Sequence, residues 1–292
     1  MSKRVCENDE NEYGKWESIP GEMLVMVVVK MPVDEMMRVV PLVCKAWLGV
    51  VSSPDCWKNI NLLQWSLGKQ RSKQVDVAVK KLVAYSNSSF QMLSASRIGN
   101  AGFAFAANHA KCLKILTMPG SNVTDQMVIR HAESLANLTL LDVSHCSNIS
   151  SKGLEAFGKH CKSLIGLKRN MAPASLGMSI QEQASMIDES EAMVIANTMS
   201  KLEQLEINYG RFTNRGINSV LNNCKALSHL DIWGCWNVWP DEGLEKKCEE
   251  LAFFRSPWVD DDDDDFETEE SSNNYDSENL TDNASSYDSE ES

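Results

Sequence analysis

An internal repeat constrains the fold of this chain more than any other feature. Residues 138–149 read LTLLDVSHCSNI and residues 227–238 read LSHLDIWGCWNV, and both fit the pattern L-x-x-L-x-(V/I)-x-x-C-x-x-(I/V). Weaker copies begin at Leu113, Leu164 and Leu202. The first leucines of the five copies are 25, 26, 38 and 25 residues apart, so one step carries an insertion. A period of this length predicts stacked structural repeats.

Each copy combines a short strand with a helical segment. A sixth, degenerate copy is SFQMLSASRI, which begins just before Phe90. In one helical segment, Leu154, Phe157 and Cys161 are spaced as a single apolar helix stripe. A unit this small cannot bury its own apolar face, so we expect about six units to stack over residues 90–251.

Stacking determines the architecture that we expect. Strands in a sheet lie about 4.8 Å apart, whereas packed helices need about 10 Å. The array should therefore bend, with parallel strands on its concave side and helices on its convex side. The sequence predicts a short right-handed α/β solenoid.

Cysteines recur at fixed places in this frame. Cys146 and Cys235 follow the strands, and Cys161 and Cys224 lie near helix ends. We expect them to be buried thiols that pack as small apolar groups. The other copies have Ala95, Ser121 and Gly210 at the position after the strand. Nine cysteines without a CxxC pair favour reduced thiols in the cytosol or nucleus, and we expect no metal site and no cofactor.

The charge is distributed very unevenly. Residues 259–292 hold 15 Asp and Glu and no Lys or Arg, which leaves 28 basic and 26 acidic residues in the rest of the chain. A nearly neutral body argues against nucleic acid as a partner. The apolar run from Met23 to Val29 is too short to span a bilayer, so we expect no membrane association.

A compact apolar segment precedes the repeats. Residues 16–62 predict a helix between Pro20 and Pro32, then a second helical stretch that Pro41 kinks or divides. Together they form an expected three-helix bundle, with Trp47 and Trp57 as its bulky core residues. Such a small bundle keeps an unusually apolar surface, which is typical of a site for a protein partner.

This segment resembles the F-box. The matching residues are Ile19-Pro20, Glu22, Leu24, Met31-Pro32, Val43-Cys44-Lys45, Trp47 and Asp55-Cys56-Trp57. Val and Met replace several of the family's usual leucines. From residue 16 to about 250, the chain is similar to plant-type F-box/leucine-rich-repeat proteins with cysteine-containing repeats.

The resemblance implies a substrate-recognition subunit of an SCF-type ubiquitin ligase. Such a subunit docks on an SKP-family adaptor, and through it on the cullin and the RING subunit, while its repeats hold a protein client. The implied adaptor-contact or contact-supporting residues are Ile19, Pro20, Leu24, Val28, Val43, Cys44 and Trp47. The role requires no catalytic residue, and the chain has no P-loop, GxGxxG, GxSxG or HExxH motif.

The client surface should be formed by outward-pointing strand positions, because strand side chains alternate between two faces. We expect it to include Gln91, Leu93, Asp142, Ser144, Lys168, Asn170, Glu206, Asn208, Asp231 and Trp233. The acidic members indicate a client with basic character. Trp233 is the candidate anchor; alternatively it packs with Trp236 and Trp239.

The remaining segments complete the predicted organisation. Residues 1–15 form a disordered N-terminus, and residues 63–89 form a linker with a helix that caps the stack. An insertion lies near 170–187. The acidic segment 252–292 is expected to be disordered. Within it, Ser285 and Ser289 lie in acidic surroundings that suit phosphorylation.

Two other interpretations of the apolar segment remain open. Its residues could be only the core of an N-terminal helical subdomain. The whole chain could also be a repeat scaffold for protein interactions without coupling to a ligase, since the F-box resemblance is rich in Val and Met.

Overall fold

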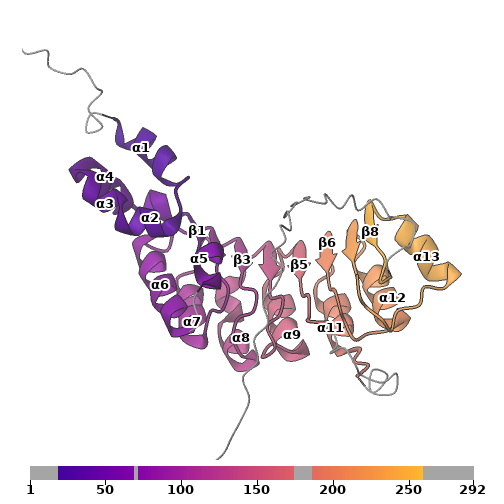
Figure 1. Cartoon of the computed structure of the whole chain (residues 1–292). Coiled ribbons are helices and arrows are strands. Elements are labelled where there is room, and N and C mark those ends of the chain that lie inside the picture. Colours follow the sequence, from indigo (N-terminus) through magenta and orange to yellow (C-terminus); the bar gives the residue numbers. More distant parts are fainter. Residues whose placement is uncertain (1–18, 69–71, 174–185, 259–292) are drawn as a thin grey trace, which may run out of the picture. The chain divides into compact units, whose positions relative to one another are not determined.

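The computed structural model describes residues 19–68, 72–173 and 186–258, and its repeats share one parallel sheet (Figure 1). Eight strands of three residues each pair in the order of the sequence. They are β1 (Asn59–Asn61), β2 (Met92–Ser94), β3 (Ile115–Thr117), β4 (Leu140–Asp142), β5 (Gly166–Lys168), β6 (Gln204–Glu206), β7 (His229–Asp231) and β8 (Phe253–Arg255). The prediction of parallel strands alternating with helices is confirmed.

The helices fall into an N-terminal group and a row that alternates with the strands (Figure 1). The first group is α1 (Gly21–Val28), α2 (Val33–Arg38), α3 (Val40–Val43), α4 (Lys45–Val51) and the 3-10 helix η2 (Pro54–Trp57). The second is α5 (Leu63–Leu67), α6 (Ser72–Tyr85), α7 (Asn100–Asn108), α8 (Asp125–His131), η3 (Ala132–Leu135), α9 (Ser151–His160), α11 (Ser190–Thr198), α12 (Asn214–Asn223) and α13 (Glu242–Glu249).

The repeat core is a stack of apolar side chains from the strand centres. The stacked residues are Ile60, Leu93, Leu116, Leu141, Leu167, Leu205 and Leu230, and all are buried and in register. Each buried side chain of this size contributes about 1.5–3 kcal/mol. The stack therefore holds the repeats together and sets their register.

A series of side-chain hydrogen bonds joins successive repeats near the starts of their helices. In each link, a side-chain oxygen accepts the backbone N–H of a residue in the next repeat. The pairs are Asp76 with Gly99, Asn100 with Thr124, Asp125 with Ser150, Glu189 with Thr213 and Asn214 with Trp239. These bonds satisfy amide groups that a helix start leaves without a partner, so they fix the spacing of the helices.

The predicted capping helix is present at the N-terminal end of the stack, and a further helix lies at the C-terminal end. Helix α6 buries Val75, Val79, Leu82 and Val83, the stripe expected from its sequence. At the other end, α13 buries Leu244 and Cys248.

The predicted boundaries of the repeats were too narrow, because the sheet has two more strands than the sequence indicates. Strand β1 lies inside segment 16–62, which was assigned to the F-box, and pairs with β2. Strand β8 lies inside segment 252–292, which was expected to be disordered, and pairs with β7. The acidic run, Ser285, Ser289 and most of the insertion lie outside the described residues.

The N-terminal module has more helical breaks than the predicted three-helix bundle. The second predicted helix is divided into α2, α3 and α4, and Cys44 between α3 and α4 is extended, with φ −164° and ψ 176°. Trp57 holds the module together, because its indole N–H donates to the Val51 carbonyl at 2.8 Å. The same ring stacks on Tyr85 of α6 at 5.9 Å, so the module also packs on the capping helix.

Candidate interaction surfaces

Exposed apolar side chains gather on the N-terminal module. We call this set the F-box face; its members are Met23, Met26, Val27, Val29, Val39, Leu42, Val43 and Leu48. Leu42 is 83% exposed and Met26 is 71% exposed. Apolar side chains so clustered and so exposed are typical of a surface that a protein partner covers.

The structure separates the expected adaptor residues into two groups. Pro20 and Val43 are exposed, and Ile19 and Cys44 are half-buried. The others, Leu24, Val28 and Trp47, are buried in the module core. Because these three are buried, they fit the contact-supporting part of the predicted set and not the contacting part, and adaptor binding itself stays a prediction.

Most members of the F-box face were not among the adaptor-contact residues expected from the sequence. The helical period shows how they come to be exposed. In α1, Leu24 and Val28 lie on the buried side, whereas Met23, Met26 and Val27 lie on the opposite side. A helix that is apolar all round does not reveal in its sequence which side faces the core. The one available signal was that so short a segment contains more apolar residues than its core can bury, so that some of them must be exposed.

The second surface is the side of the sheet that carries the third residue of every strand. We call it the strand face; these residues are Asn61, Ser94, Thr117, Asp142, Lys168, Glu206, Asp231 and Arg255. Lys168 pairs with Glu206 at 2.5 Å, and Arg255 pairs with Asp231 at 3.6 Å. Asp142 lies in no ion pair among the described residues, so it is the one carboxylate of this row without a cation.

The expected strand positions were wrong in the first copy. Leu93 is fully buried and in register with Leu116, so it belongs to the core stack. Gln91 precedes β2. The register places Met92 and Ser94 on the side of the strand face, where Met92 is half-buried and Ser94 is buried. The frame slipped by three residues, an odd number that exchanges the two faces of the strand, because this copy lacks the leading leucine. The same slip affects the post-strand position, which the register gives to Ile98 and not to Ala95.

The expected residues just beyond the strands connect neighbouring repeats. Ser144 is buried, and its hydroxyl accepts the N–H of Asn170 at 3.2 Å. The side-chain oxygen of Asn170 accepts the N–H of Asn208 at 3.0 Å. Since Asn170 and Asn208 are only half-buried, they border the strand face while they join the repeats.

The C-terminal tryptophans form two separate groups. The half-buried Trp233 ring packs edge-on against Tyr209 at 5.1 Å, and the Arg255 guanidinium lies over it at 4.9 Å. Trp236 and Trp239 instead pack against Trp258, at 5.1 and 4.4 Å. The cation over Trp233 belongs to the strand face, so this ring continues that surface.

A hollow interrupts the middle of the strand face. It has a volume of about 300 Å³ and is bordered by Ile115, Leu140, Lys168 and Gln204. Gly166 lies at its floor, and a Cβ there would collide with the Leu140 side chain. The absence of a side chain at this position therefore opens the hollow.

The repeat cysteines are buried hydrogen-bond donors. The thiols of Cys146, Cys161, Cys224 and Cys235 donate to backbone carbonyls of the preceding repeat, at 3.2–3.5 Å. Burial raises the pKa of Cys161 and Cys235 to about 12, and that of Cys146 and Cys224 to about 11. The expectation that these thiols are buried is confirmed.

The described residues 19–68, 72–173 and 186–258 contain no cluster of three or more His, Cys, Asp or Glu placed to hold a metal ion. Within the same ranges, each helix is too short or too polar to cross a lipid bilayer.

The fold and the two surfaces define a repeat protein with a small helical module, rich in exposed apolar residues, at its N-terminal end. F-box protein FBW2 of Arabidopsis thaliana is 36% identical over 240 residues, which are 82% of this chain and 74% of that relative. F-box protein SKIP1 is 26% identical over 242 residues, 77% of this chain and 81% of the relative. Putative F-box/LRR-repeat protein 23, from the same plant, is 27% identical over 250 residues, 85% of this chain and 54% of the relative.

The chain belongs to the plant F-box/leucine-rich-repeat family. No family model matches its sequence.

Proposed function

We propose that this chain is a substrate-recognition subunit of an SCF-type ubiquitin ligase. Its F-box face docks on an SKP-family adaptor, which links the chain to the cullin and the RING subunit. Its repeats hold a protein client on the strand face, so that the client is ubiquitinated and degraded by the proteasome. Similarity to F-box proteins over 82% of the chain supports this role.

The mechanism is geometric. Holding a client beside the ubiquitin-conjugating enzyme raises the effective concentration of the client's lysines near the reactive thioester. The chain needs no catalytic residue or cofactor for this role, and we assign it none.

The observation that carries the proposal is the exposure of the F-box face. Leu42, at 83% exposure, gains about 1.5–3 kcal/mol when a partner covers it fully. The seven other members of the F-box face are also exposed and apolar, so they add to the area that a partner can cover.

Binding of the purified SKP-family adaptor to the full chain, measured by calorimetry, tests the proposal. Leu42→Ser should weaken binding at least about tenfold, as expected for an interface anchor. Ile129→Ser is the matched control, because Ile129 on α8 is also an exposed apolar residue, at 54%. Equal effects of the two substitutions would contradict docking through the F-box face.

The scaffold without ligase coupling is the alternative, and the same titration distinguishes it. Failure of the unaltered chain to bind any SKP-family adaptor would favour the scaffold. The full chain is the correct reagent, because a fragment that ends at residue 62 would retain β1 without its partner β2.

We also propose that the chain acts in the cytosol or nucleus. The eight cysteines of the described residues all have free thiols, which supports a reducing compartment. Fluorescence microscopy of the tagged full chain tests this location.

A further inference from the structure

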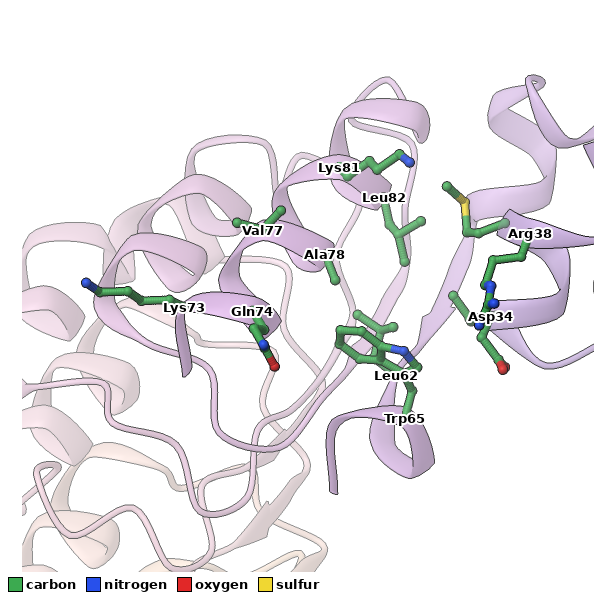
Figure 2. A pocket seen from close by; sticks show the side chains of 12 residues that line it. Asp34, Arg38, Leu62, Trp65, Lys73, Gln74, Val77, Ala78, Lys81 and Leu82 are labelled. Carbon is green, nitrogen blue, oxygen red and sulfur yellow. The ribbon is translucent and has the colours of Figure 1, made fainter. Parts of the chain in front are cut away.

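A cavity of about 640 Å³ lies between the F-box helix α2 and the capping helix α6 (Figure 2), and its lining residues belong neither to the F-box face nor to the strand face. Its walls and floor are apolar: Val33 and Met37 come from α2, Ala78 and Leu82 from α6, and Leu62 and Trp65 from the connection between them. The volume lies within the range of about 300–1,000 Å³ that is usual for small-molecule sites.

Cations dominate the rim of this cavity. Arg38 and Lys81 project from opposite walls, and Lys73 lies farther along α6 (Figure 2). Asp34 is the one carboxylate among the lining residues. None of the three cations forms an ion pair with another residue in the described part of the chain. The cavity therefore combines an apolar interior with an excess of positive charge at its mouth.

No side chain of residues 19–68, 72–173 or 186–258 fills this space. Val77 of α6 lines the cavity and is 66% exposed. A second hollow, of about 580 Å³, borders Val33, Asp34 and Trp65 as well. Helix α2 thus stands between two hollows, where the F-box meets the repeats. A molecule bound in the larger one would contact the F-box and the capping helix together.

We propose that this cavity is a binding site for a small organic anion with an apolar body. The body lies on Trp65, Leu62 and Ala78, and the anionic group is held by Arg38 and Lys81. Charge-assisted hydrogen bonds to these side chains are about twice as strong as neutral ones, so the anion adds affinity to the burial of the body. The site is independent of the proposed ligase role.

Two fluorescent probes with the same body test the proposal on the full chain. 1-Anilinonaphthalene-8-sulfonate carries an anionic group, whereas N-phenyl-1-naphthylamine is uncharged. We expect saturable binding of both, with the sulfonate at least about tenfold tighter because of its charge-assisted contacts. The double substitution Arg38→Gln, Lys81→Gln should bring the sulfonate to the affinity of the neutral probe. Lys80→Gln, on the same helix, is the control and should change neither.

Substitutions in the wall of the cavity test whether the probes bind there. Ala78→Phe should abolish binding of both because it fills the interior. If that variant loses its circular dichroism signal, Val77→Trp at the exposed edge obstructs the mouth instead. Leu42→Ser should leave binding unchanged, because Leu42 belongs to the F-box face.

Three outcomes would overturn the proposal. The first is binding that survives in folded Ala78→Phe or Val77→Trp. The second is loss of binding in Leu42→Ser, which would place the probes on the F-box face. The third is full displacement of the probes by the SKP-family adaptor, which would assign the cavity to a protein interface.

Discussion

The guanidinium of Arg169 lies against the carboxylate of Glu191 and forms two hydrogen bonds with it, at 2.7 and 3.1 Å. Arg169 is only 2% exposed and occupies the position after β5 where neighbouring repeats place an apolar residue, such as Val143. Its other N–H groups donate to the carbonyls of Val143, Cys146 and Ile149 at 2.6–3.3 Å. The buried Arg169 side chain therefore provides hydrogen-bond donors for the backbone carbonyls in the turn of the preceding repeat, next to the insertion.

Replacing Arg169 should destabilise the repeats strongly. Arg169→Met leaves three buried carbonyls and the Glu191 carboxylate without their donor, so we expect a loss of about 3–5 kcal/mol in the free energy of unfolding. Urea denaturation measures this loss. Lys168→Met is the matched control and should cost less than about 1 kcal/mol, because the Lys168–Glu206 ion pair is exposed. Equal losses would show that the buried network adds little.

The two sides of α1 should respond differently to truncation. Leu24→Ala removes a buried side chain and should lower the free energy of unfolding by about 2–5 kcal/mol. Met23→Ala alters a side chain that is 60% exposed, so it should change stability by less than about 0.5 kcal/mol while it weakens adaptor binding. Urea denaturation and calorimetric titration of the adaptor measure these effects. A large stability loss in Met23→Ala would contradict the assignment of this side to the F-box face.

Trp233 should anchor the client. Trp233→Ala removes a ring that lies beside Tyr209 and Arg255 on the strand face, so we expect loss of client capture. Proximity labelling with full chains identifies clients, and thermal unfolding of the same variants measures stability. Trp239→Ala is the control, because Trp239 belongs to the other aromatic group. Equal loss of capture and stability in Trp233→Ala would favour a packing role for the ring.

Alkaline pH should destabilise the fold through its buried thiols. Burial raises the pKa of Cys235 to about 12, above the ordinary value of 9.0. The thiols must stay protonated in the folded state, so their contribution is complete below pH 9.0 and is lost as the pH rises toward 11 and 12. Urea denaturation between pH 8 and pH 11, a range set by these pKa values, should show falling stability.

Substitution of the thiol provides the control for this pH dependence. Cys235→Ala should be less stable than the unaltered chain at neutral pH, because it leaves a small cavity and removes the hydrogen bond from the thiol. Above pH 9.0, however, its stability should fall less steeply, because the buried thiol is absent. An unchanged slope would rule out Cys235 as a source of the alkaline sensitivity. At neutral pH, iodoacetamide should label the exposed Cys112 long before the buried Cys146.

The repeated parts of this fold could be predicted from the sequence, whereas the strands at its two ends could not. The leucines of five copies indicated the core stack, and the helical stripe that includes Val75 and Val79 indicated the N-terminal cap. Strands β1 and β8 remained hidden, because a three-residue strand outside the leucine frame carries almost no periodic signal.

The interaction surfaces were only partly predictable for related reasons. The charged residues of β4 to β7 point outward, as strand alternation requires, but their pairing across strands depends on register. The sequence could not show that Lys168 and Arg255 neutralise Glu206 and Asp231. The cavity beside α2 depends on how the module packs on α6, which no local pattern encodes.

Strand β1 follows directly on the helices of the N-terminal module and belongs to the repeat sheet. In the proposed ligase role, the module that binds the adaptor is therefore joined through the backbone to the same sheet that holds the client. Each strand adds about 4.8 Å to the length of the sheet, so in that role the number of repeats would set the distance between adaptor and client. A variant of this chain with one repeat added or removed should, on the same proposal, hold its client correspondingly farther from or nearer to the adaptor.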